Sequence, residues 1–435
     1  MAVALSRTKT SGRTFERRVE EYRHPRIAVL LVAGAVSWFW LVVRDGSPPW
    51  QLVRGAVVVV ATVGALVGFT MWRQRQVGDT ASTLGMTGVV VAVGFAPHVA
   101  KTGLSAASVA ATTLLVASLF MVIGGVALAG RGRSRPARVV AAILTAATTA
   151  FTAWIVSPAI AATNVPRPSI GATPASAGLA YEDVMLRTSD GVDLAGWFVP
   201  PENSAAVVLL HGAGSTRSSV IEHAAAIARN GFGVLLVDAR GHGESGGRAM
   251  DFGWHGDRDI EAATRFLGGQ SSVDPRRIAV VGMSMGGEEA VGASASNPMI
   301  SAVVAEGATA RSAHDEGWLS DAYGWRGAIQ EQLERVQDVA TDVLTSASPP
   351  IGNRDAVRAS GDIRYLLIAA GAVPEEQHAA AYVIPAAPRR VETWTVDGAG
   401  HTDGVRVAAA VWERRVVDFL RDALGVEAEP TEGRG

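Results

Sequence analysis

Two patterns of apolar residues divide this chain into two halves. In the first half, apolar runs of 17 to 25 residues recur, and each is long enough to cross a hydrocarbon core of roughly 30 Å. Small residues such as Gly64 and Gly68 would allow close helix contacts in lipid. We therefore predict an α-helical transmembrane bundle of about five spans over residues 27–162. The runs are residues 27–43, 52–72, 84–100, 105–129 and 139–162, the third being short and ending near Pro97.

Beyond residue 180 the apolar segments become short and alternate with amphipathic ones. Such strand–helix alternation predicts a mostly parallel sheet covered on both faces, with ligands at the carboxyl ends of the strands. Ser189-Asp190-Gly191 indicates a hairpin between the first two strands. Strands are expected at residues 184–187, 192–199, 206–210, 233–237, 278–281, 302–305, 364–369 and 391–396. Helices are expected at residues 220–229, 257–267, 286–296 and 405–423.

Composition sets the remaining domain boundaries. Residues 163–180 are rich in Pro, Ser, Ala and Gly without periodicity, which predicts a linker ahead of an α/β domain at 181–425. Residues 310–356 interrupt the strand–helix alternation and carry apolar residues at helical spacing. We interpret them as a helical cap over the site, with a plain surface excursion as the alternative. The last ten residues, 426–435, are expected to form a flexible tail.

The formal net charge of −2 conceals a strong asymmetry between the halves. Residues 1–169 carry 17 Lys/Arg and 5 Asp/Glu, and residues 170–435 carry 22 Arg and 36 Asp/Glu. With five spans, 13 cations of the first half fall on one side, including the basic arm at residues 1–26. The positive-inside bias then places the arm in the cytoplasm, near anionic lipid, and the second half outside the cell membrane. If the third run does not span, the second half becomes cytoplasmic.

Several classes of chemistry find no support in the sequence. The chain has no cysteine, which excludes disulfides and a cysteine nucleophile. It has no His-Glu-x-x-His metal motif and no Gly-x-x-x-x-Gly-Lys phosphate loop, so we expect no metal and no cofactor. No aromatic residues are interleaved with a basic domain, so nucleic acid is not an expected partner. The lipid bilayer remains as an expected partner.

Residues 278–287 carry the strongest chemical signal. Four apolar residues lead into Gly282-Met283-Ser284-Met285-Gly286 and a second glycine, a pattern typical of a strand that turns sharply into a helix. A Cβ at Gly282 or Gly286 would collide with backbone where the chain folds back. Such a turn would expose the Ser284 hydroxyl at a helix N-terminus, where the dipole favours developing negative charge.

A nucleophilic serine needs a general base and an oxyanion hole. His401 follows the last predicted strand on a glycine-rich loop and is the expected base, whereas His211 and His242 are expected to support turns. Two backbone N–H groups should meet the developing oxyanion. Met285, directly after the serine, would supply one of them, and Ala213, in the loop after an earlier strand, would supply the other.

The acidic partner of His401 is less clearly marked. It should follow the strand at 364–369, where the loop contains no Asp. We favour Glu376 narrowly over Glu375, and Glu306, after the preceding strand, is a third choice. Each glutamate could instead be a carboxylate that stabilises a helix dipole.

Residues 181–424 resemble the α/β-hydrolase family, in particular bacterial serine esterases, lysophospholipase-like hydrolases and serine aminopeptidases. The resemblance implies a small-molecule or lipid acyl ester as substrate. Ser284 would attack its acyl carbonyl, His401 would transfer the proton, and water would hydrolyse the acyl-enzyme. An acyltransferase with the same triad and a catalytically silent membrane scaffold or sensor are the alternatives. The missing Asp departs from the commonest family pattern. The matching motifs are His211-Gly212-Ala213-Gly214, residues 238–245, residues 282–286 and Gly400-His401, in the order serine, acid, histidine.

Overall fold

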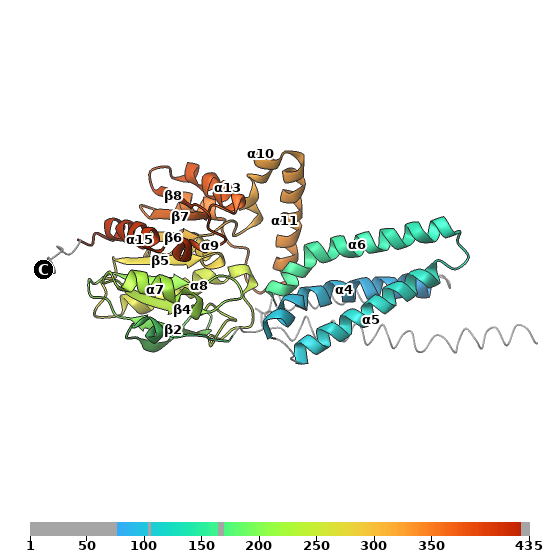
Figure 1. Cartoon of the computed structure of the whole chain (residues 1–435), viewed down its shortest axis with the longest axis horizontal. Coiled ribbons are helices and arrows are strands. Elements are labelled where there is room, and N and C mark those ends of the chain that lie inside the picture. Colours follow the sequence, from blue (N-terminus) through green and yellow to red (C-terminus); the bar gives the residue numbers. More distant parts are fainter. Residues whose placement is uncertain (1–75, 103–105, 164–168, 428–435) are drawn as a thin grey trace, which may run out of the picture. The chain divides into compact units, whose positions relative to one another are not determined.

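The computed structural model describes residues 76–102, 106–163 and 169–427 of the 435-residue chain (Figure 1). The basic arm at 1–26, the first two apolar runs and residues 428–435 lie outside the described residues. The prediction of five spans therefore stays a prediction.

Three helices of the described part are long and apolar enough to cross a membrane. They are α4 (Gln76–Thr102), α5 (Ala106–Ala129) and α6 (Arg135–Ala162). Small side chains let these helices approach one another: a Cβ at Gly94 would meet the Ile160 side chain at 2.6 Å. The Ser157 hydroxyl donates a hydrogen bond of 2.9 Å to the Val90 carbonyl, which satisfies a polar group inside an apolar helix pair.

The second half folds around one eight-stranded sheet with the order β1-β2-β4-β3-β5-β6-β7-β8. Strand β2 pairs antiparallel with both β1 and β4, and all other pairings are parallel. The predicted, mostly parallel sheet is thus confirmed. The strands are β1 (Glu182–Arg187), β2 (Asp193–Val199), β3 (Ala206–Leu210), β4 (Gly233–Val237), β5 (Ile278–Met283), β6 (Ala302–Glu306), β7 (Arg364–Ala370) and β8 (Val391–Val396).

Helices cover both faces of this sheet, which explains why its central strands are apolar at every position (Figure 1). In β3, Val207 and Leu209 enter one core, and Val208 and Leu210 enter the other. The first core is closed by α7 (Ile221–Ala228) and α15 (Ala409–Leu424). The second core is closed by α8 (Gly256–Gly268), α9 (Met285–Ala293), α12 (Asn353–Ala359) and α13 (Pro374–Val383).

Two local predictions differ from the structure. The helix expected at 405–423 is broken at Ala408, whose φ and ψ are −135° and 46°, into α14 (Gly404–Val407) and α15. The Glu306 carboxylate accepts hydrogen bonds from Gly404 N and Trp412 Nε1 on either side of this break. Helix α13 lies where we expected a loop, and it begins at Pro374, which is well suited to the first turn of a helix.

The insertion after β6 is helical. It contains the 3₁₀ turn η4 (Ala313–Glu316), α10 (Leu319–Tyr323) and α11 (Trp325–Leu344), and we call residues 310–352 the cap segment. The last predicted cap residues, 353–356, belong instead to α12, which packs on α9. Trp318 of the cap segment stacks on His378 of α13 at a ring-centroid distance of 5.2 Å. The cap segment therefore touches the helix that carries Glu376.

Candidate active site

Ser284 lies at the sharp turn between β5 and α9, as its sequence pattern predicts. Its φ and ψ are 54° and −123°, a strained conformation for a residue with a side chain. Glycine is required on both sides of it: a Cβ at Gly282 would overlap the Gly286 carbonyl. At Gly286, a Cβ would approach the His211 carbonyl to 2.7 Å. The turn holds the Ser284 side chain at the N-terminus of α9.

His401 meets Ser284 from the loop after β8. Its Nε2 lies 2.9 Å from Ser284 Oγ, although 117 residues separate the two in sequence. Gly307, with φ of +70°, lies beneath the ring, where a Cβ would come within 3.0 Å of His401 Cε1. A glycine at this point thus lets the imidazole approach the backbone at the end of β6.

Glu376 lies on the other side of the imidazole. Its Oε1 is 2.7 Å from His401 Nδ1, and its Oε2 accepts a 2.7 Å hydrogen bond from Ala370 N. Glu376 is only 1% exposed, in the first turn of α13. Because a carboxylate only accepts, the proton lies on Nδ1, and Nε2 is free to accept from the Ser284 hydroxyl. The hydrogen bond to Glu376 raises the pKa of His401.

The other two candidate acids have different partners. Glu375 turns toward the cap segment, where Tyr323 Oη lies 3.5 Å from its Oε1. Glu306 is buried and accepts from Gly404 N and Trp412 Nε1 at 2.8 and 2.7 Å. Burial raises the pKa of Glu306. Glu306 therefore holds the loop that carries His401. Among the described residues, no hydrogen bond joins Glu306 to the imidazole.

The two residues expected to form the oxyanion hole both border the serine. Met285 is the first residue of α9, so its N–H has no carbonyl one turn earlier in the helix. Ala213 is exposed and lines the same pocket as Ser284. Its neighbours Gly214 and Ser215 donate their N–H groups to His242 Nε2 and to the Gly212 carbonyl. Ala213, from the loop after β3, and Met285, directly after the nucleophile, therefore remain the two candidate donors.

Two buried histidines hold the loop that contains Ala213. His211 Nε2 accepts a 3.0 Å hydrogen bond from Ala239 N, and His242 Nε2 accepts one of 3.0 Å from Gly214 N. An accepting Nε2 places the proton on Nδ1, which donates to a carbonyl in each case: Gly212 O and Arg240 O. Burial lowers the pKa of His211 to about 4, so the ring stays neutral. Both histidines thus support turns, as expected.

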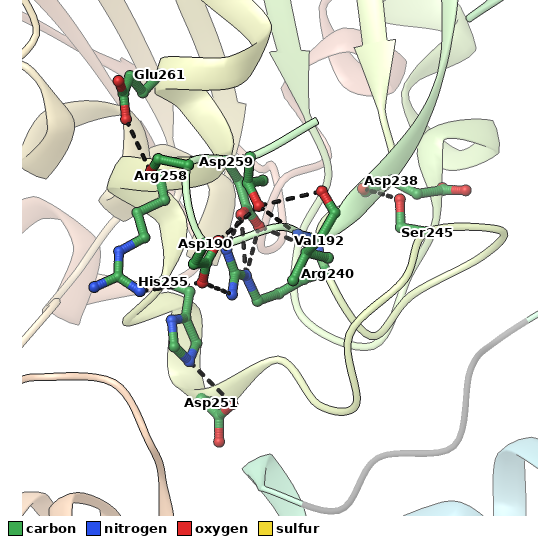
Figure 2. Close-up of polar contacts among 12 residues, drawn as sticks. Asp190, Val192, Asp238, Arg240, Ser245, Asp251, His255, Arg258, Asp259 and Glu261 are labelled. Carbon is green, nitrogen blue, oxygen red and sulfur yellow. Dashed lines mark hydrogen bonds and ion pairs between the residues drawn. The ribbon is translucent and has the colours of Figure 1, made fainter. Parts of the chain in front are cut away.

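The loop after β4 is fixed by buried charges, a feature that the sequence alone did not reveal. Arg240 pairs with Asp259 and Asp190 at 2.6 and 2.8 Å, as Figure 2 shows. In the same loop, Ser245 Oγ donates to the Asp238 carbonyl at 2.6 Å (Figure 2). A buried arginine between two carboxylates fixes its loop firmly, because removing one partner would leave a buried charge without compensation. This loop carries His242 and so supports the turn at Ala213.

A pocket of about 1080 Å³ opens at Ser284 and His401. Its polar wall includes Ser215, Ser218 and Ser219. Another part of the lining is unexpected, because it comes from the segment interpreted as a linker. There Pro174 is buried in the 3₁₀ turn η1 (Pro174–Ala177), and Gly171 N donates to Ser218 Oγ at 3.0 Å. The linker residues lining the pocket are Ala172, Ser176 and Ala177.

Among the described residues, no group of three or more His, Asp or Glu side chains could hold a metal ion. The groups that meet at the pocket are the Ser284 hydroxyl, the His401 imidazole and, behind it, the Glu376 carboxylate.

The chain is similar to several known proteins. A family model described as serine aminopeptidase, S33, matches residues 201–349. The uncharacterized protein Rv2307c of Mycobacterium tuberculosis (strain ATCC 25618 / H37Rv) is 34% identical over 247 residues, covering 54% of this chain and 78% of that protein. The alpha/beta hydrolase domain-containing protein WAV2 of Arabidopsis thaliana is 33% identical over 139 residues, covering 31% of this chain and 44% of that protein. The esterase Pf2001 of Pyrococcus furiosus aligns with a TM-score of 0.48 and 25% identity, covering 60% of this chain and 97% of that chain.

Sequence and structure agree on the kind of domain that follows α6. The match to Rv2307c extends over most of that protein, and the matched family model includes Ser284 and its flanking glycines. The strand order, with only β2 pairing antiparallel, places the serine after β5 and the histidine after β8. The resemblance inferred from the motifs is thus confirmed for the second half of the chain. The chain belongs to the α/β-hydrolase family.

Proposed function

We propose that this protein is a membrane-anchored serine hydrolase that cleaves an ester or related acyl bond. The observation that carries the proposal is the continuous hydrogen-bonded series from Ser284 through His401 to Glu376, with distances of 2.9 and 2.7 Å. Serine, imidazole and carboxylate in this order form the constellation that activates a hydroxyl for nucleophilic attack. A catalytically silent scaffold would have no need to keep the strained backbone at Ser284.

In the proposed reaction Ser284 Oγ attacks the acyl carbonyl while His401 Nε2 takes the hydroxyl proton. The carbonyl oxygen becomes an oxyanion facing the N–H groups of Met285 and Ala213, and each such donor contributes about 3 kcal/mol to the transition state. His401 then gives its proton to the leaving oxygen, and an acyl-enzyme on Ser284 remains. Water, deprotonated by His401, releases the acid and restores the serine.

The first half of the chain supports the proposed location of this activity. The three long apolar helices support a multi-pass membrane anchor. From Thr163 to Thr173 only eleven residues separate α6 from η1, which is a reach of at most about 40 Å. The catalytic domain would therefore act close to the bilayer surface. The loop charges favour its extracytoplasmic side.

The pocket suggests the general character of the substrate. Its volume is at the upper end of the range for small-molecule sites. Its wall combines the hydroxyls of Ser215, Ser218 and Ser219 with apolar groups such as Val405. An amphiphilic ester of lipid or envelope origin fits both the mixed lining and the position near a bilayer.

The proposal is tested by steady-state hydrolysis with the full chain in detergent micelles. Esters with acyl chains of graded length are compared between the wild type and Ser284→Ala. We expect turnover for the wild type and a loss of at least about 10³-fold in kcat for the variant. Equal rates in the two proteins would contradict the proposal.

A competing acceptor separates hydrolysis from acyl transfer. In the presence of a primary alcohol or amine, a hydrolase releases mainly free acid, whereas an acyltransferase gives mainly the new ester or amide. Predominant transfer at low acceptor concentration would replace the proposed hydrolase by the acyltransferase alternative.

A further inference from the structure

Helix α11 of the cap segment turns its apolar side chains away from the protein. Trp325, Ile329, Val336 and Val339 are 71, 52, 50 and 64% exposed. Their spacing places them on one side of an α-helix, and we call this side the α11 apolar face. A helix of a globular domain ordinarily buries such a face against its core. Among the described residues nothing apolar covers it.

The polar side of α11 faces the protein instead. Glu331 Oε1 accepts a 2.8 Å hydrogen bond from Ser320 N, and Asp338 Oδ2 accepts one of 2.7 Å from Ala313 N. Thr341 on the same side is buried. Gly327 permits the close approach to α10, because a Cβ there would overlap the Leu319 carbonyl. The apolar face is thus held outward by polar contacts on the opposite side.

Charge follows the same division. The four acids of α11, at positions 331, 334, 338 and 342, are all partly buried, and burial raises the pKa of Glu334 and of Asp338. The exposed charged residues of α11 are Arg326 and Arg335. Arg326 lies over the Trp325 ring at 5.5 Å. The outward surface of α11 therefore combines aromatic and aliphatic side chains with cations and presents no exposed carboxylate of its own.

We infer that α11 lies in the interface of a lipid bilayer, with its apolar face among the acyl chains. An apolar side with tryptophan, bordered by arginines that reach anionic headgroups, is the composition of an interfacial helix. The inference rests on the proposed membrane anchoring and deepens it. It also gives the cap segment a role, because a cap embedded in lipid would hold the α/β domain at the bilayer surface.

The bilayer is favoured over other occupants by the covalent tether. Any span that α6 makes keeps η1 within about 40 Å of the membrane, since only eleven residues intervene. On a domain tethered near lipid, a surface of α11 that exposes Trp325 and has no exposed acid of α11 favours a bilayer as its occupant over a second protein. Residues 170–435 carry 36 Asp/Glu against 22 Arg, whereas the exposed charged side chains of α11 are both arginines.

The absence of cysteine from the chain allows a direct test. The full chain is prepared as Ile329→Cys or Val336→Cys and labelled with an environment-sensitive fluorophore. The matched control is Ser271→Cys, an exposed position between α8 and β5 at the opposite edge of the sheet from Ser284. Each protein is reconstituted into vesicles of phosphatidylcholine and phosphatidylglycerol, and quenching by spin-labelled lipid is compared with quenching by iodide.

We expect lipid quenching at least about three-fold stronger at both α11 positions than at Ser271, because interfacial helices bury their apolar face roughly 5–10 Å deep. The ratio should not change with the protein-to-lipid ratio. Equal lipid quenching at all three positions would overturn the inference. Lipid quenching that weakens when lipid is added would also overturn the inference, because it indicates contact with a second copy. Shielding from iodide without lipid quenching would overturn it as well, because it indicates that another segment of this chain covers the face.

A functional readout complements the spectroscopy. The double variant Ile329→Gln/Val336→Gln changes only exposed side chains, so it should fold. We expect about ten-fold lower turnover of an ester dissolved in vesicles and unchanged turnover of a soluble short-chain ester. Equal loss on both substrates contradicts the docking role. A wild-type protein that does not react with a fluorophosphonate would instead count against the proposed function. A wild-type protein that does not float with vesicles would count against its membrane anchoring.

Discussion

Glu376 Oε1 lies 2.7 Å from His401 Nδ1, while the adjacent Glu375 points to Tyr323 of the cap segment. Both carboxylates belong to the first turn of α13, where Glu376 is buried and Glu375 is exposed. A buried carboxylate at Nδ1 fixes the tautomer in which Nε2 can accept a proton from Ser284.

Replacing this carboxylate should disable catalysis without changing the fold. We expect Glu376→Gln to lower kcat by about 10³- to 10⁴-fold, because the amide can donate to Nδ1 and stabilise the wrong tautomer. Glu375→Gln is the matched control and should stay within about two-fold of the wild type. Steady-state kinetics with a chromogenic ester provides the measurement. The assignment is wrong if the two variants lose activity equally.

Activity should depend on pH through His401. The hydrogen bond to Glu376 raises the pKa of His401 above its usual value of 6.5, and the base must be neutral to accept a proton. The quantity kcat/KM should therefore rise with pH, and the midpoint of this rise should lie above pH 6.5. In Glu376→Gln the residual activity should show a lower midpoint. A wild-type midpoint below 6.5 would contradict the assigned environment of the imidazole.

The turn at Ser284 should tolerate no side chain at Gly286. Because a Cβ there comes within 2.7 Å of the His211 carbonyl, we expect Gly286→Ala to lower the free energy of unfolding by about 3 kcal/mol. Gly361→Ala is the control, since a Cβ at that glycine meets nothing within 4 Å and its φ is not positive. Thermal unfolding of the two variants measures the difference. Similar melting temperatures would show that the turn is less tightly packed than described.

The wall formed by residues 172–177 should affect substrate choice. Ala177 is exposed and lines the pocket, so Ala177→Trp should raise KM for esters with bulky groups by about ten-fold and leave acetyl esters unaffected. Ala175→Trp, in the same turn but away from the pocket lining, is the control. Kinetics over a series of esters distinguishes the two. A uniform change for all esters would remove this segment from the binding site.

Local sequence patterns placed Ser284 and His401 at the sheet edge where the structure brings them together. Gly-x-Ser-x-Gly after an apolar run requires a specific backbone, and the structure has it at Ser284. Strand ends placed His401 nearby, because the carboxyl ends of parallel strands share one edge of a sheet. The choice between Glu376 and Glu375 needed the first residue of α13, since a one-residue shift on a helix rotates a side chain by about 100°.

Other features depend on contacts between distant segments, which periodicity does not encode. The break at Ala408 accompanies hydrogen bonds from Gly404 and Trp412 to Glu306, a residue about a hundred positions earlier. The linker becomes a pocket wall because Gly171 bonds to Ser218 and Pro174 is buried. The sequence of α11 has the pattern of an ordinary amphipathic helix. Only the structure reveals that the polar side of α11 is turned toward the protein.

The nucleophile itself offers the most direct test of the account. The full chain is treated with a fluorophosphonate, and the modified peptide is identified by mass spectrometry. We predict a single adduct on Ser284, no labelling in Ser284→Ala, and much slower labelling in His401→Ala. A folded wild type that stays unlabelled, or equal labelling of Ser284→Ala, would contradict the claim that Ser284 is the activated serine.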